Sequence, residues 1–260
     1  YINSKWKENY SILFAASVLR EISDVKIYAT GLSLFPHEDY FDRARLSNCL
    51  SSFSHISVRD DVSAGLFDLE NKGDDAFLGI QLNLYPISDN SNCPDILCCI
   101  QSELADENKF SSLVDRTCSY LLEQQQQGKK IGYFEAIPGA DSFAFHKLQE
   151  KIDGIAFYPF ASVWGNGLPA NHRTEIISTR FHHHLIGASH GLKGSAMIID
   201  SDYYSNKHSS LLNIDTGWQL LGNDISNEIF LPSANPEFKN LAKKLSLEKL
   251  SLAQEIYSTE

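Results

Sequence analysis

The sequence predicts an α/β protein built from two Rossmann-like domains that face each other across a cleft. Short apolar runs of strand type alternate along the chain with longer segments in which apolar residues recur at helical spacing. The segments between successive runs are long enough to form crossover helices, which join parallel strands. The alternation restarts after a polar turn, and we therefore expect two sheets, each covered by helices.

The first series of elements ends at residue 71. It opens with a helix in which Ile12, Ala16 and Leu19 recur at helical spacing. A short buried strand follows and ends at Gly31, and the helix–strand unit then repeats before a last helix with an acidic first turn. The expected elements are helices over residues 6–22, 40–53 and 60–71 and strands over residues 25–30 and 55–59.

The turn Asn71-Lys72-Gly73-Asp74-Asp75 is the expected domain boundary. We assign residues 1–71 to the remainder of an N-terminal Rossmann-like domain and residues 72–235 to a C-terminal one. Residues 236–260 form a helix that packs back across the junction. The elements expected in the second domain are strands over residues 96–100, 130–136, 154–160, 175–179 and 195–200 and helices over residues 109–127, 141–151 and 181–190.

Composition narrows the class of protein. The 33 acidic residues outnumber the 22 basic ones and give a formal charge of -11, which disfavours binding to nucleic acid and leaves at most a peripheral association with membranes. The five cysteines are odd in number and unevenly spaced, as expected for reduced thiols, so we expect a cytoplasmic location. Because the chain opens at Tyr1 in a helical pattern, we expect a fragment whose first domain is incomplete.

One strand-to-helix segment combines residue types that bind anions. In parallel sheets, ligands bind where the carboxyl end of a strand meets the next helix, and residues 175–190 have this form. Arg180 offers a rigid set of donors for a carboxylate or phosphate, and His182 can exchange a proton near neutral pH. The alternative is that Arg180 only caps a neighbouring loop.

Two further cations follow predicted strands. Arg59 comes just before an acidic helix, so it either binds an anion or pairs with Asp60 or Asp61. Lys207 would approach the crevice near Arg180, unless it is simply a solvated lysine. Unranked acid–base candidates near strand ends are Asp75, Asp200, Asp202 and Asp215.

No metal site is predicted. His182, His183 and His184 are adjacent, so on a helix they point about 100° apart and cannot converge on one ion by themselves. We expect His183 and His184 to be packing or surface residues. The sequence also lacks the phosphate loop, the nucleophile elbow and the glycine-rich dinucleotide fingerprint, which argues against an ATPase, an α/β-hydrolase and a dinucleotide-dependent dehydrogenase.

Three segments, in this order, resemble the polysaccharide pyruvyl transferases. They are His55-Ile-Ser-Val-Arg-Asp-Asp-Val-Ser63, Thr179-Arg-Phe-His182, and Lys207 ahead of Leu211 and Leu212. Each motif is short, so their order and spacing over most of the chain carry the resemblance. The chain departs from the family in lacking its N-terminal Gly-Asp loop and in having Gly191-Leu-Lys-Gly-Ser195 in place of a short Gly-Pro turn.

The resemblance implies a glycosyltransferase-B-like fold with an acceptor-side first domain and a donor-side second domain. It implies transfer of pyruvate from phosphoenolpyruvate onto two hydroxyls of a sugar in a surface polysaccharide, such as an exopolysaccharide or capsule, or its precursor. A cyclic ketal forms and phosphate is released, without a cofactor. Whether the saccharide acceptor is lipid-linked stays open.

The resemblance also implies roles for individual residues. Arg59, Arg180, Phe181, His182 and Lys207 match donor-binding positions, and the expected catalytic residues are Arg180 and His182. The two arginines would clamp the phosphate and carboxylate of phosphoenolpyruvate. His182 would aid phosphate binding or deliver the proton that ketal formation requires.

Two other functions remain open. A glycosyltransferase that uses a nucleotide-activated sugar can have the same two-domain fold, because fold does not fix function. In that case a diphosphate would occupy the Arg180 site. A non-catalytic carbohydrate-binding module would use Trp6, Trp164 and Trp218 as stacking platforms.

Overall fold

The computed structural model describes residues 7–37, 42–103, 106–199, 203–222 and 229–258, and the chain divides into two compact units. Unit 1 comprises Tyr1–Leu78 and Lys244–Glu260, and unit 2 comprises Gly79–Lys243. The predicted boundary after residue 71 is earlier in the chain than the observed one. The residues that follow the predicted boundary still belong to unit 1. Asp74 pairs with Arg59 and Asp75 pairs with Lys249, and both partners lie in that unit.

Unit 1 contains a small parallel sheet in the order β1-β2-β3. Strand β1 is Tyr28–Leu32, β2 is His55–Val58 and β3 is Glu70–Asn71. The helices are α1 (Lys7–Ile22), α2 (Arg43–Ser51) and α3 (Asp61–Phe67). The core of the unit consists of buried apolar side chains from these elements and the segment after β1, namely Leu13, Leu34, Leu46, Cys49, Leu50, Val58 and Phe67.

Helix α3 is shorter than the helix predicted over residues 60–71. The carboxylate of Asp60 caps its start by accepting a hydrogen bond of 2.7 Å from the backbone N–H of Ser63. Asp68 ends it, because this residue adopts a left-handed conformation with φ of 53°. The chain can then extend into β3, which pairs with β2 in parallel.

Unit 2 contains a six-stranded parallel sheet in the order β6-β5-β4-β7-β8-β9. The strands are β4 (Ile96–Cys99), β5 (Ile131–Phe134), β6 (Ala156–Tyr158), β7 (Glu175–Ser178), β8 (Gly194–Met197) and β9 (Gln219–Leu221). Counted from one to six along the chain, these strands have the spatial order three-two-one-four-five-six, which is that of a doubly wound Rossmann sheet. The prediction of parallel α/β architecture is therefore confirmed.

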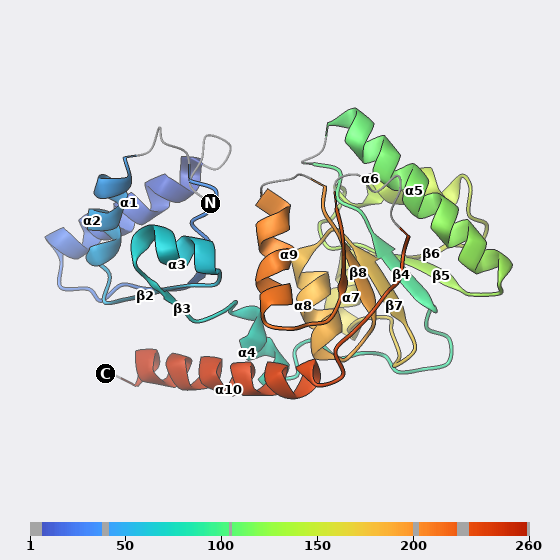
Figure 1. The fold of residues 1–260 in the computed structure, drawn as a ribbon. Coiled ribbons are helices and arrows are strands. Elements are labelled where there is room, and N and C mark those ends of the chain that lie inside the picture. Colours follow the sequence, from blue (N-terminus) through green and yellow to red (C-terminus); the bar gives the residue numbers. More distant parts are fainter. Residues whose placement is uncertain (1–6, 38–41, 104–105, 200–202, 223–228, 259–260) are drawn as a thin grey trace. The chain divides into compact units, whose positions relative to one another are not determined.

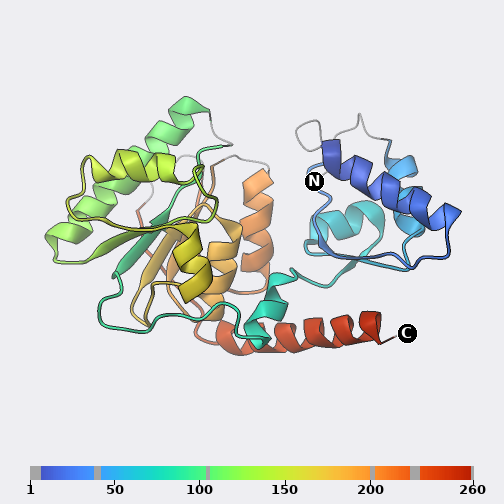
Figure 2. The same cartoon turned by 180° about the vertical axis from the view of Figure 1, so that it is seen from behind.

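Helices cover both faces of this sheet, as Figures 1 and 2 show from opposite sides. The helices are α5 (Glu107–Gln126), α6 (Ser142–Gln149), α7 (Phe160–Asn166), α8 (Phe181–Ser189) and α9 (Tyr203–Asn213). The side chains of adjacent residues in β7 lie on opposite faces of the sheet. Ile177 belongs to the core formed with α5 and α6, whereas Ile176 lies against Gly187 of α8.

Two helices link the units in sequence. Helix α4 spans Ala76–Gln81, and α10 spans Phe238–Tyr257, where the sequence predicted a helical tail. Each of them contains a boundary between the units. None of the helices in the described ranges is long and apolar enough to cross a membrane.

Candidate functional site

The strand order of unit 2 reverses between β4 and β7, and the segments after these strands meet at the carboxyl edge of the sheet. The backbone N–H of Gln101, after β4, donates to the hydroxyl of Thr179, after β7, at 2.9 Å. The hydroxyl of Ser102 donates to the carbonyl of Ala140 at 2.8 Å. The loops after β4, β5 and β7 are thereby held together at the switch point, where open parallel sheets bind their ligands.

Arg180 lies at this edge, as predicted from the sequence, and two carboxylates hold its guanidinium. Its Nε lies 3.0 Å from Oδ1 of Asp141, and its Nη2 contacts the same oxygen. Its Nη1 lies 2.6 Å from Oε1 of Glu103. The side chain of Asp141 is 0% exposed, whereas that of Glu103 is 33% exposed, so the first ion pair belongs to the interior and the second lies near solvent.

Asp141 is also tied to the backbone. Its Oδ2 accepts hydrogen bonds of 2.9 Å from the N–H groups of Ala136 and Ile137, which follow β5. Burial by itself would lower the pKa of Arg180, but the hydrogen bonds and charges of Asp141 and Glu103 outweigh it and raise that pKa. Arg180 is therefore a fixed cation that is held by two carboxylates.

The other residues predicted around Arg180 lie in two helices. Phe181, at the start of α8, is buried, and His182 beside it is exposed, with the two rings 5.2 Å apart. Lys207 is half-buried and lies within α9. The same helix contains Leu211 and Leu212, which follow Lys207 in the motif. The next residue, His208, contacts the carbonyl of Thr179 and so connects α9 to the end of β7.

His183 and His184, which the sequence left as packing or surface residues, are buried and pack against aromatic rings. His183 stacks on Phe134 with ring centroids 3.8 Å apart. His184 stacks on Trp218 at 4.6 Å, and its Nδ1 lies 3.2 Å from Nδ1 of His208. Burial lowers the pKa of both His183 and His184.

The hydrogen bonds assign the protons of the His184–His208 pair. Nε2 of His208 lies 3.3 Å from the carbonyl of Thr179, which only accepts, so this nitrogen carries the proton. Nδ1 of neutral His208 then accepts from Nδ1 of His184. Nε2 of His184 in turn accepts from the hydroxyl of Thr216 at 2.8 Å. Both imidazoles are neutral in this arrangement.

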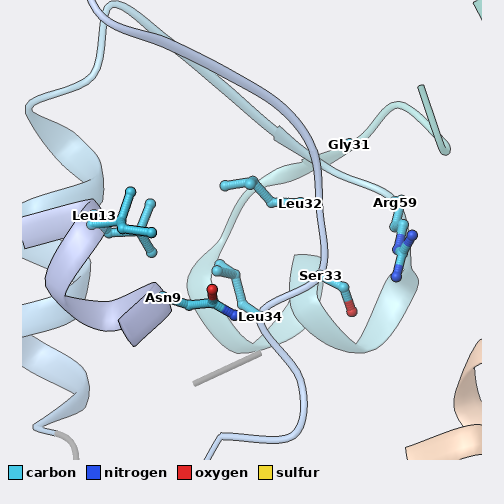
Figure 3. Close-up of a pocket in the computed structure, with 8 residues that line it drawn as sticks. Asn9, Leu13, Gly31, Leu32, Ser33, Leu34 and Arg59 are labelled. Carbon is cyan, nitrogen blue, oxygen red and sulfur yellow. The ribbon is translucent and has the colours of Figure 1, made fainter. Parts of the chain in front are cut away.

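Arg59 lies in unit 1, at the carboxyl end of β2, and lines a pocket of about 290 Å³. Figure 3 shows Asn9 and Leu13 of α1 on one side of the pocket and Arg59 on the other, with Leu32 and Ser33 between them. The remaining lining residues are Ile12, Gly31 and Leu34. The pocket thus combines an apolar wall with an amide, a hydroxyl and a guanidinium.

The sequence suggested Asp60 or Asp61 as the ion-pair partner of Arg59, and the structure identifies Asp74 instead. Nη1 of Arg59 lies 2.6 Å from Oδ2 of Asp74. Asp60 is used as the cap of α3, and Asp61 accepts a hydrogen bond from the side chain of Asn71. The proximity of acidic residues in sequence did not determine the pairing.

The four aspartates considered as acid–base candidates lie in different parts of the chain. Asp75 accepts from Thr30 and pairs with Lys249, both at 2.7 Å, within unit 1. Asp215 accepts from the side chain of Asn235 at 2.8 Å. Asp200 and Asp202 lie outside the described residues. Within the ranges given above, His, Cys, Asp and Glu side chains form no group of three that could hold a metal ion.

Sequence reasoning did not identify Asp141, Glu103 or Gln101. Asp141 and Glu103 are 39 and 77 residues from Arg180 in the chain, so only the fold brings them together. A signal existed in principle, because each of the three residues closely follows a predicted strand in a parallel sheet.

No family model and no curated protein matches this sequence. Among solved structures, the chain is similar to Os79 from O. sativa, which was crystallised in complex with UDP, with a TM-score of 0.38 and 10% sequence identity. The similarity covers 86% of this chain and 58% of the Os79 chain. The chain therefore spans less than two thirds of the length of that protein.

Proposed function

We propose that the protein is a transferase that modifies a carbohydrate. The observation that supports this proposal is the position of the two arginine motifs. Arg59 and Arg180 each follow a parallel strand and precede a helix, and Arg180 lies at the switch point of a doubly wound sheet. These are the places where α/β enzymes bind substrates.

The motif order suggests a specific reaction, the transfer of pyruvate from phosphoenolpyruvate onto two sugar hydroxyls. In this version Arg180 binds an anionic group of the donor, and Phe181 and Lys207 belong to the same unit, while Arg59 is the candidate anion-binding residue of unit 1. His182, which is exposed at the start of α8, assists the phosphate or supplies a proton. Binding at Arg180 requires the donor to replace Glu103, the more exposed of the two carboxylate partners.

A second candidate reaction is glycosyl transfer from a nucleotide-activated sugar, in a glycosyltransferase-B-like fold. The carboxylates around Arg180 suit the hydroxyl groups of such a donor, because Asp141 and Glu103 together outnumber the single guanidinium and disfavour a phosphate or diphosphate beside it. A carboxylate at a strand end can instead accept hydrogen bonds from ribose or sugar hydroxyls. Glu103 has the position and exposure for that contact.

Thermal unfolding with phosphoenolpyruvate and with UDP-glucose, each tested separately, distinguishes the two reactions. A ligand present at 100 times its dissociation constant stabilises a protein by roughly 2.7 kcal/mol, which raises the melting temperature of a chain of this size by about 5 °C or more. A shift with phosphoenolpyruvate alone supports pyruvyl transfer, and a shift with UDP-glucose alone supports glycosyl transfer. If neither ligand shifts the melting temperature, the proposal of a transferase using these donors is wrong.

His182→Ala tests the role of the second motif. The side chain is exposed, so the substitution should change the free energy of unfolding by only about 0.5 kcal/mol. We expect donor-dependent turnover to fall at least about tenfold, as for the loss of a general acid or a phosphate contact. His172→Ala removes another exposed histidine, with a side chain that is 79% exposed, and should leave turnover unchanged.

A further inference from the structure

Gln101 has a buried side-chain amide that makes no hydrogen bond to any described residue. The residue is 0% exposed, and neither Oε1 nor Nε2 has a hydrogen-bond partner within the described part of the chain. An unsatisfied buried amide destabilises a folded protein by about 1–3 kcal/mol, so native structures contain few of them. Packing alone would be served better by an apolar side chain of the same length.

The position of Gln101 suggests what the amide is for. Its backbone N–H is fixed to the hydroxyl of Thr179, so the residue lies at the switch point between β4 and β7. Glu103 follows two residues later and holds Arg180, and Ser102 between them is bonded to the loop that carries Asp141. The unsatisfied amide is thus part of the same edge as the Arg180 site.

The chemistry of this edge favours a neutral ligand rich in hydroxyls. A primary amide provides an acceptor and a donor side by side, so it can accept from one hydroxyl and donate to its neighbour. The carboxylates of Asp141 and Glu103 outnumber the guanidinium of Arg180, which disfavours an additional anion but suits hydroxyl donors. Turning the Gln101 side chain toward a ligand breaks no hydrogen bond that the described residues make.

We propose that Gln101 is a recognition residue for the sugar, and that its amide binds two neighbouring hydroxyls of a saccharide at the switch point of the six-stranded sheet. This inference rests on the proposed carbohydrate-modifying function and names the part of the substrate that this edge recognises.

Gln101→Met is the informative variant, because it keeps the length of the side chain and removes both polar atoms. Without ligand, we expect its melting temperature to equal or exceed that of the wild type, since the unsatisfied amide is gone. Binding of a saccharide should weaken about tenfold or more, because hydroxyls that were recognised by hydrogen bonds lose their partners. The probes are the methyl glycosides of glucose, galactose and mannose, each followed by saturation-transfer difference NMR.

Gln219→Met is the matched control. The amide of Gln219 accepts from Ser195 and from the N–H of Leu231 and donates to the carbonyl of Ile229, with distances of 2.7 to 2.8 Å. Because both polar atoms of the Gln219 amide are hydrogen-bonded within the protein, its replacement should lower the melting temperature and leave glycoside binding unchanged. If Gln101→Met is as destabilising as Gln219→Met, Gln101 is a structural residue and the inference is wrong.

The remaining outcomes are also decisive. Unchanged glycoside binding by Gln101→Met overturns the inference whatever its stability, and so does a wild-type protein that binds none of the three glycosides. If Gln101→Met does not fold, the amide is structural and the inference again fails. Failure of the proposed transferase function is seen separately, as the absence of a melting shift with phosphoenolpyruvate and with UDP-glucose.

Discussion

At the scale of single residues, the contact that defines the candidate site is the ion pair between Arg180 and Asp141. The Asp141 side chain is 0% exposed and that of Arg180 is 11% exposed. Removing both charges from water is costly, and the pair is tolerated because Asp141 also accepts two backbone N–H groups. Removal of one partner leaves the other charge buried and uncompensated.

We therefore expect Asp141→Ala to lower the free energy of unfolding by roughly 3–5 kcal/mol, measured by urea denaturation at neutral pH. Glu103→Ala is the matched control, because it removes the more exposed carboxylate bound to the same guanidinium. Its effect should stay within about 1 kcal/mol. Equal effects of the two substitutions would show that Asp141 has no special structural role.

The sequence was sufficient to locate Arg180 but not to describe its surroundings. A strand followed by a helix predicts which residue reaches the carboxyl edge, because that depends on local pattern alone. The partners depend on strand order, which brings the ends of β4, β5 and β7 together. Arg59 illustrates the same limit, since its partner Asp74 lies beyond β3, a segment whose local pattern predicted the end of a helix.

At the scale of elements, a chain of imidazoles connects helices α8 and α9 to the end of β7. His184 of α8 donates to His208 of α9, and His208 donates to the carbonyl of Thr179. Burial lowers the pKa of His208 to about 4, helped by the charge of Lys207 and opposed by the bond to Thr179. Protonation of His208 would add a hydrogen to its Nδ1, which then faces the N–H of His184 Nδ1, so the hydrogen bond between the two rings would be lost.

This arrangement predicts that stability falls in mild acid. The pKa of an unfolded histidine is near 6.5 and that of folded His208 is about 4, so the unfolded chain binds more protons between these values. The free energy of unfolding should therefore decrease as the pH falls from about 6.5 to about 4, with roughly 3 kcal/mol from His208 alone. Above about pH 6.5 the contribution of His208 to the free energy of unfolding should be constant.

Urea denaturation followed by circular dichroism at several pH values measures this slope. His208→Gln should be less stable at neutral pH but should show a shallower loss between pH 6.5 and 4, because one titrating group is absent. His172→Gln removes an exposed histidine and should keep the wild-type slope. Parallel profiles for all three proteins would contradict a role for His208 in the acid sensitivity.

Long periodic elements were easier to predict than short ones. Helices α1 and α5 lie close to their predicted bounds, because many apolar residues repeat at helical spacing. The predictions did not include α4, α7 and β9, which have six, seven and three residues. In elements this short, the tertiary contacts determine the conformation and the local pattern carries little information.

At the scale of the whole chain, the C-terminal helix α10 belongs to both units. Its residues up to Lys243 group with unit 2 and those from Lys244 with unit 1. In unit 1, Ser246 donates to the carbonyl of Phe77, and Lys249 pairs with Asp75 at 2.7 Å. The side chain of Lys249 is only 4% exposed, so the end of α10 completes unit 1 even though it lies far from that unit in sequence.

Lys249→Ala should therefore destabilise unit 1 selectively. Asp75 would keep its hydrogen bond from Thr30 but lose its charged partner, and we expect a loss of roughly 1–3 kcal/mol. Hydrogen exchange followed by mass spectrometry can locate the effect. The amides of β1 and β2 should exchange faster in the variant, whereas those of β4 and β7 should keep their wild-type rates, because local stability varies between parts of a structure.

Lys244→Ala tests whether the expected destabilisation of unit 1 arises from the burial of Lys249 and not from the loss of a charge or a change in helix propensity. Lys244 lies in the same helix, but its side chain is 72% exposed and forms a loose 3.8 Å ion pair with Glu248. Its replacement should change stability by about 0.5 kcal/mol or less and leave exchange in both units unchanged. If the two lysine variants behave alike, the buried pair with Asp75 does not hold α10 to unit 1, and the helix would have to be secured by its apolar contacts alone.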